Sequence, residues 1–217
     1  MLLPAPFPFP GVSASLDDEA LLLRSDTPLH ILSSAVVGGG FTRADVIINR
    51  HVSKHYDHPD PAAELTAFAR ERGVSGAFVG LMTAVYMKNT RVVTLSEGKL
   101  RLTLVMTAGF SNTTAAGLSP SAALRPGTIN IILLIDARLT PAAMVNAVIT
   151  ATEAKTHVLR SWGLQTPDGL PATGTSTDAV VIASTGRGPN LPYAGPATPV
   201  GHLMGRAVRQ GLEASKP

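Results

Sequence analysis

Hydroxyl and carboxylate side chains are concentrated in one short segment in the last third of the chain. The run Thr173-Gly174-Thr175-Ser176-Thr177-Asp178 places four hydroxyls and a carboxylate beside a glycine, directly before the apolar stretch 179–183. Side chains of this kind at the entrance of a buried strand are suited to hold a polar ligand at the edge of a sheet. Similar polar segments at 107–112 and 127–130 predict that the three meet in one polar site.

Asp178 is the member of this run that could orient a water or a hydroxyl nucleophile, because Thr175 and Ser176 stand beside it. The structural alternative is an aspartate that accepts hydrogen bonds from backbone amides of its own turn. The chain has no Gly-x-Ser-x-Gly segment, which argues against a serine hydrolase built on a nucleophile elbow.

A second carboxylate, Glu153, lies two residues before Lys155 in the middle of a predicted long helix rich in alanine and valine. Residues two apart on a helix do not face each other, so these two do not form a standard helical ion pair. The apolar surroundings predict a largely buried helix, on which Glu153 would serve as a general base. An exposed charged pair is the alternative.

Asparagine side chains follow or end three apolar segments, and each combines a hydrogen-bond donor with an acceptor. They suit the binding of amides, although bonds from the side chain to a nearby turn are the ordinary alternative. The three residues are Asn49, Asn112 and Asn130.

Histidines and aspartates gather in a predicted loop after the first asparagine. Imidazole and carboxylate groups at such density can bind zinc or iron, but their spacing matches no established metal motif. Contact with a substrate, or a solvated loop, is the interpretation we favour over a metal. The residues are His51, His55, Asp57, His58 and Asp60.

The composition excludes several classes of protein. The 217 residues suit one domain, and the absence of cysteine excludes disulfides, thiolate nucleophiles and cysteine-ligated metals. The net charge of +3 comes from scattered residues, without the basic stripe that nucleic acids require. The phosphate-binding glycine patterns are absent, and the proline-rich segment 1–10 resembles neither a signal peptide nor a membrane span. We therefore expect a cytoplasmic protein without nucleic-acid or membrane partners.

The elements expected to position these residues alternate between strand and helix. Strands are predicted at 13–26, 29–37, 45–49, 79–87, 91–95, 100–107, 129–135 and 179–183, and helices at 60–72, 140–162 and 201–212. This order predicts a single mixed α/β domain, residues 1–217, with helices packed on a mixed sheet. Segments 47–86 and 128–183 share a strand, a Pro-Ala-Ala helix start and a second strand. This pattern leaves open a β-α-β duplication about a pseudo-twofold axis.

Taken in order, the segments resemble the adenosylcobinamide amidohydrolase (CbiZ) family of corrinoid-salvage enzymes. Each segment is weakly specific by itself, whereas the ordered set covers most of the chain. Two positions depart from the pattern, Thr113 and Ala194, and neither removes a candidate catalytic group. The segments are 33–40, 47–52, 80–84, 107–112, 127–130, 153–155, 172–178, 193–195 and Gly201.

The resemblance implies hydrolysis of the amide that joins the corrin side chain of adenosylcobinamide to aminopropanol. The products would be adenosylcobyric acid and 1-aminopropan-2-ol. The corrinoid is then the substrate, and no cofactor or metal is expected. A corrinoid carrier without catalysis and a hydrolase of other amides are the alternatives, and the sequence leaves open a homo-oligomer.

The expected roles rest on residue chemistry. Glu153 or Asp178 would activate a water, the amides and hydroxyls of 174–177 would hold the oxyanion, and Lys155 or His51 would protonate the amine. In the competing mechanism, Ser176 or Thr175 is a covalent nucleophile. The residues expected to bind the substrate are Asn49, His51, Thr83, Asn112, Asn130, Thr173, Gly174, Thr175 and Thr177.

Overall fold

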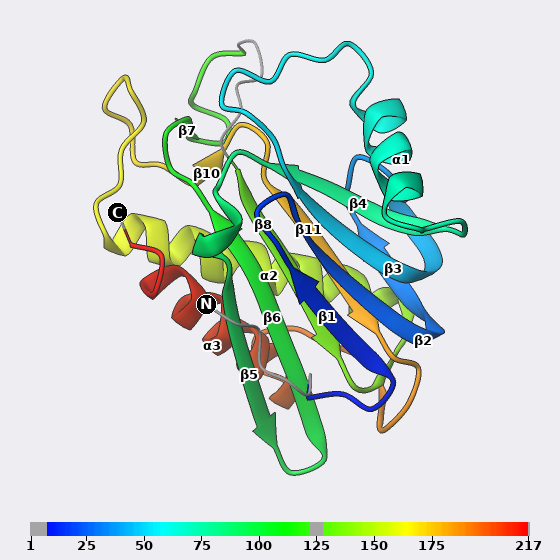
Figure 1. The fold of residues 1–217 in the computed structure, drawn as a ribbon. Helices are drawn as coiled ribbons and strands as arrows, with labels where there is room; N and C mark the ends of the chain where they lie inside the picture. Colours follow the sequence, from blue (N-terminus) through cyan, green and yellow to red (C-terminus); the bar gives the residue numbers. More distant parts are fainter. Residues whose placement is uncertain (1–7, 122–127, 217) are drawn as a thin grey trace.

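The fold is a single mixed α/β domain built around one large sheet (Figure 1). The computed structural model describes residues 8–121 and 128–216. Gly127 and the first seven residues of the proline-rich N-terminus lie outside the described residues. The eight strands of the large sheet follow the order β4-β3-β2-β11-β8-β6-β5, and β1 pairs with β2. They are β1 (Val12–Leu16), β2 (Ala20–Ser33), β3 (Gly40–His51), β4 (Phe78–Thr83), β5 (Arg91–Glu97), β6 (Leu100–Ala108), β8 (Ile129–Ile135) and β11 (Ala179–Ser184).

The remaining described elements are short strands and helices. Two small sheets pair β7 (Thr113–Thr114) with β10 (Gly174–Thr175), and β9 (Arg138–Leu139) with β12 (Asn190–Leu191). The helices are α1 (Pro61–Glu71), α2 (Pro141–Ser161) and α3 (Pro199–Glu213), with the short 3-10 helix η1 (Met87–Asn89).

The central strands are buried on both faces, because alternate side chains enter different cores. In β8, Ile131 and Leu133 pack under α2 and α3, whereas Ile132 and Leu134 enter a second core with residues of β2, β3 and β4. In β3, Ile47 joins this second core, whereas Ile48 packs under α1 in a third. The β2–β4 part of the sheet therefore packs over the face of β6, β8 and β11 that lies opposite α2 and α3.

All three α-helices begin with the same local signal. A polar side chain accepts a hydrogen bond from the third following amide, and proline occupies the first turn. The caps are Asp60 for α1, Thr140 for α2 and Thr198 for α3. The first two starts were predicted from the sequence, whereas α3 begins before the predicted Gly201, because Thr198 and Pro199 form its cap.

Both predicted β-α-β units are present in the sheet. β3 and β4 are parallel neighbours joined through α1, and β8 and β11 are parallel neighbours joined through α2. A pseudo-twofold axis between the units remains a prediction. The two predicted strands at 13–26 and 29–37 are instead a short β1 and one long β2. β2 continues past a register shift between Arg24 and Leu29, where it pairs with β3.

Among the described residues, every helix is too short or too polar to cross a bilayer.

Two glycines on α3 provide a matched test of this packing. A Cβ on Gly201 would collide with the carbonyl oxygen of Gly195 and lie 2.9 Å from that of Ala194, whereas a Cβ on Gly205 would meet no atom within 4 Å. We expect Gly201→Ala to lower the free energy of unfolding by about 1–3 kcal/mol through overpacking. Gly205→Ala should raise it by about 0.5–1 kcal/mol, because alanine favours the helix. Urea denaturation measures both, and equal effects would contradict this packing of α3 on the 194–195 loop.

Candidate active site

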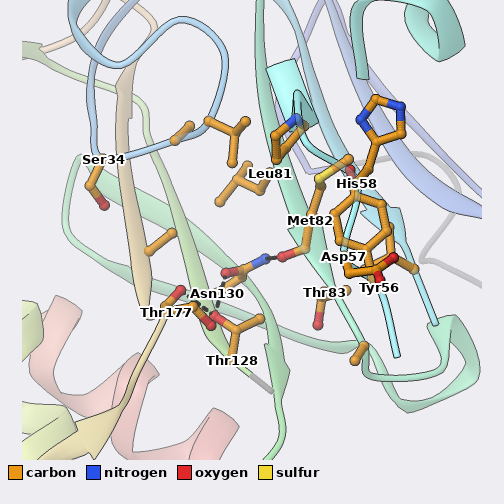
Figure 2. A pocket seen from close by; sticks show the side chains of 16 residues that line it. Ser34, Tyr56, Asp57, His58, Leu81, Met82, Thr83, Thr128, Asn130 and Thr177 are labelled. Carbon is orange, nitrogen blue, oxygen red and sulfur yellow. Dashed lines mark hydrogen bonds between the residues drawn. The ribbon is translucent and has the colours of Figure 1, made fainter. Parts of the chain in front are cut away.

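A cleft opens where the ends of β3 and β4 approach the beginnings of β8 and β11 (Figure 2). It has a volume of about 360 Å³. The loop after β2 forms one wall, and the segment between β3 and α1 forms another. The lining residues are Ser34, Ala35, Val36, Val52, Tyr56, Asp57, His58, Pro61, Leu81, Met82, Thr83, Ala84, Thr128, Asn130, Thr177 and Ala179.

A buried amide, Asn130, forms part of the cleft lining. Its Nδ2 donates to the Oδ1 of Asn49 at 2.8 Å and to the carbonyl oxygen of Met82 at 2.9 Å. Because a carbonyl oxygen can only accept, the second contact fixes the orientation of the amide. Asn49 in turn donates to Thr107 Oγ1 at 3.1 Å. These contacts join β8 to β3, β4 and β6, which makes this part of the cleft rigid.

The predicted carboxylate Asp178 lies next to this network, at the beginning of β11. It forms an ion pair with Lys155 of α2, and both side chains are largely buried. It also accepts hydrogen bonds from the amide of Ile129 at 3.1 Å, the amide of Thr175 at 3.1 Å and the hydroxyl of Thr175. With these four donors, the carboxylate holds α2, β8, β10 and β11 together.

Gly174 is required by this cluster. A Cβ at this position would collide with the carboxylate of Asp178 and lie 2.8 Å from Lys155 Nζ. The predicted polar run therefore folds around its own aspartate, which accepts hydrogen bonds from its own turn, as the alternative to a catalytic role predicted. Asp178 also binds Lys155 from the distant helix α2. Thr128 connects the cluster to the cleft, since its hydroxyl donates to the carbonyl oxygen of Thr177 at 2.6 Å.

The prediction that Glu153 is buried is wrong. Its side chain is exposed and lines a different groove, between α2 and α3, with His157, His202 and Arg206. The physical reason is helical geometry. Residues two apart point about 200° apart around a helix axis, so the burial of Lys155 turns Glu153 towards solvent.

Thr83 belongs to the cleft lining, and His51 lies beside it on the neighbouring strand, outside that lining. They are register partners on the parallel strands β3 and β4, so their side chains emerge on the same face. Thr83 lines the cleft, and its Oγ1 accepts from the amide of Val85. His51 Nδ1 donates to the carbonyl oxygen of Val85 at 3.1 Å, and its ring packs on Tyr86. This contact leaves the second ring nitrogen, Nε2, as the acceptor in the neutral ring.

The other predicted binding residues lie beside the Asp178 cluster and outside the lining of this cleft. Asn112 Nδ2 donates to Ser176 Oγ at 2.6 Å. Thr173 lies between β7 and α2: its Oγ1 accepts from the amide of Ala116, and its carbonyl oxygen accepts from Thr156. The predicted binding residues therefore fall into two adjacent polar groups, one in the cleft and one around Asp178. Those that line the cleft are Thr83, Asn130 and Thr177.

Residues 56–58 line the cleft. Asp57 and His58 belong to the group of histidines and aspartates for which we favoured substrate contact or a solvated loop over a metal, whereas no sequence signal indicated Tyr56. Among residues 8–121 and 128–216, no three His, Asp or Glu side chains are placed to share a metal. His51 instead contacts Val85, and Asp60 caps α1.

Tyr56 is held in this wall by an ion pair behind it. Its hydroxyl donates to Glu64 Oε2 at 2.6 Å, and Arg50 contacts Glu64 Oε1 at 2.9 Å. Burial and the neighbouring carboxylate raise the pKa of Tyr56 well above its usual range, so the phenol remains neutral. The same hydrogen bond, together with Arg50, lowers the pKa of Glu64. Glu64 therefore stays ionised.

The buried ion pair gives a stability test. Asp178→Asn should lower the free energy of unfolding by about 3–5 kcal/mol, because Lys155 loses its counter-charge in a buried site. The double variant Lys155→Met/Asp178→Asn should recover part of this loss, since it removes the uncompensated charge. Urea denaturation of the wild type, the single variants Asp178→Asn and Lys155→Met, and the double variant measures the coupling. Additive losses would show that the two groups do not interact.

Comparison with known proteins places the chain in a family. The adenosylcobinamide amidohydrolase family model matches residues 11–216. An adenosylcobinamide amidohydrolase of Methanosarcina mazei is 33% identical over 92% of this chain and 94% of its own length. One of Halobacterium salinarum is 31% identical over 82% of this chain and 76% of its own.

Solved structures support the same fold. The PH0078 protein of Pyrococcus horikoshii matches with a TM-score of 0.52, over 95% of this chain and 79% of its own, at 12% identity. This likeness concerns the fold alone. The family match over nearly the whole chain shows that this protein belongs to the adenosylcobinamide amidohydrolase family and is an amidohydrolase.

Proposed function

We propose that the protein hydrolyses the amide between the corrin side chain and the aminopropanol of adenosylcobinamide. The products are adenosylcobyric acid and 1-aminopropan-2-ol. Membership of the family supports this reaction. In the proposal the corrinoid is the substrate, and the chemistry uses side chains of this chain with no further cofactor.

The size of the cleft supports a particular binding mode. A volume of about 360 Å³ lies at the lower end of the range for small-molecule pockets. The adenosylated corrin ring is larger than this space, whereas the side-chain arm with its amide fits it. The arm therefore enters the cleft, and the ring stays at the rim.

The single observation that carries the proposal is the fixed amide of Asn130. Its Nδ2 is occupied by Asn49 and Met82, so its Oδ1 is the atom left to accept from a substrate amide N–H. Thr128 Oγ1 lies 3.2 Å from this oxygen but only 2.6 Å from the carbonyl oxygen of Thr177. Because a hydroxyl has one proton, the shorter contact takes it, and Asn130 Oδ1 keeps an acceptor position.

His51 is the proton-transfer group in this proposal: it lies outside the cleft lining itself, but it is the register partner of Thr83, which belongs to that lining. Asp178 already accepts from four donors, and Glu153 lies in another groove. The Nε2 of neutral His51 takes a proton from the attacking water as its oxygen bonds to the amide carbon. The same nitrogen returns the proton to the leaving amine when the C–N bond breaks.

Thr175 supports a second mechanism. Its hydroxyl donates to Asp178, which accepts the proton as the threonine oxygen bonds to the amide carbon and returns it to the aminopropanol nitrogen as the C–N bond breaks. This route passes through an acyl-enzyme, which water then hydrolyses. Mass spectrometry of enzyme quenched during a single turnover would detect the added acyl group on Thr175. Under the water mechanism the mass of the protein stays unchanged.

The role of His51 is tested with Glu153 as the matched control. His51→Gln should lower kcat for adenosylcobinamide by about 100-fold or more, because it removes the proton-transfer group. Glu153→Gln should leave kcat within about twofold, in the range of a surface change distant from the cleft. Release of aminopropanol measures both variants. A large loss in Glu153→Gln with none in His51→Gln would reverse the assignment.

The same assay separates the proposed function from its alternatives. Conversion of adenosylcobinamide to adenosylcobyric acid supports the enzyme. Tight binding of the corrinoid without product would instead indicate a carrier. Faster hydrolysis of simple amides than of cobinamide would indicate a different substrate class.

A further inference from the structure

The rim of the cleft carries two stacked rings, those of Tyr56 and His58. Their centroids are 6.4 Å apart, and their planes differ by 20°. Both residues line the cleft, Tyr56 half-buried and His58 exposed, in the segment between β3 and α1 (Figure 2). The two near-parallel rings thus both belong to the cleft lining.

The protonation of the His58 ring follows from its local contact. The amide of Asp60 donates to His58 Nδ1 at 3.0 Å, so Nδ1 carries no proton. In the neutral ring the proton is therefore on Nε2, which becomes a hydrogen-bond donor. This contact belongs to the start of α1, where the carboxylate of Asp60 also caps the amide of Ala63. The helix start thus fixes the orientation of the ring.

The stacked rings are supported from behind by charged groups. The hydroxyl of Tyr56 is bound to Glu64, and Glu64 is bound to Arg50. The guanidinium of Arg50 lies 4.6 Å from the centre of the Phe68 ring, which packs in the core under α1. Tyr56 is therefore fixed before any ligand binds, which lowers the entropy cost of binding.

We propose that Tyr56 and His58 bind the corrin ring at the rim while the amide arm occupies the cleft. The Tyr56 ring packs against the apolar edge of the macrocycle, and His58 Nε2–H donates to the oxygen of a peripheral carboxamide. This inference rests on the proposed function, because it assigns the part of the same substrate that the cleft cannot hold. It makes His58 a substrate-binding residue with no part in proton transfer.

The donor assignment also separates His58 from a ligand of the corrinoid cobalt. Coordination needs an unprotonated ring nitrogen. Nε2 carries the proton, and Nδ1 is occupied by the amide of Asp60. Bound cobinamide should therefore keep the visible spectrum of its free form. A spectral shift on binding that disappears in His58→Phe would overturn the donor assignment.

The test compares His58→Phe, His58→Gln and His55→Phe with the wild-type protein. His58→Phe keeps a flat ring but has no donor, so Kd and KM for adenosylcobinamide should rise about 3- to 10-fold, the value of one hydrogen bond. The kcat should stay within twofold. Gln restores a donor and should recover most of the affinity. His55, in the same exposed segment but outside the cleft lining, is the matched control and should change nothing.

Two sets of outcomes are distinguishable. Wild-type affinity in His58→Phe, or a loss of kcat at unchanged KM, would overturn this inference while the wild-type protein still hydrolyses cobinamide. A wild-type protein that neither binds nor hydrolyses cobinamide would overturn the proposed function itself. Equilibrium dialysis gives Kd without turnover, and thermal unfolding checks that each variant is folded.

Discussion

The carboxylate of Asp178 is the point through which the polar end of the sheet is assembled. A buried carboxylate is costly unless its acceptor positions are filled, and here four donors from three separate segments fill them. Satisfying this one group places α2 against β11 and joins the beginnings of β8 and β11. The neighbouring residues Thr128 and Thr177 then meet, and they form part of the cleft.

The site combines two kinds of polar group with different tasks. Asp178 and Lys155 form an ion pair that holds α2 against the beginning of β11. Asn130 is held just as firmly, and in the proposed function its Oδ1 accepts from the substrate amide. His51 and His58 show the same principle in imidazoles, since one contact with the backbone determines which nitrogen can donate. Contacts behind the cleft thus determine which atoms of these side chains can donate or accept a further hydrogen bond.

The burial of side chains on α2 differs from what the sequence predicted. The alanine- and valine-rich helix was predicted to bury Glu153, and it buries Lys155 instead. The spacing of two residues excluded burial of both on one face, but nothing local indicated which one faces the sheet. That choice depends on Asp178, which lies 23 residues later and offers the lysine a counter-charge. The functional role of the histidine-rich segment was unresolved for a similar reason, because its ring contacts depend on the start of α1.

The sequence by itself determined the local elements and the family. Asp60-Pro61 and Thr140-Pro141 begin helices because caps act within one turn, and the apolar run Ile129–Ile135 became the buried strand β8. Only the tertiary structure decided which polar groups meet. Asn49 and Asn130 are 81 residues apart, and their hydrogen bond exists because β2–β4 pack over the face of β8. Such a contact has no local signal, since its energy depends on burial that arises only when the whole sheet has formed.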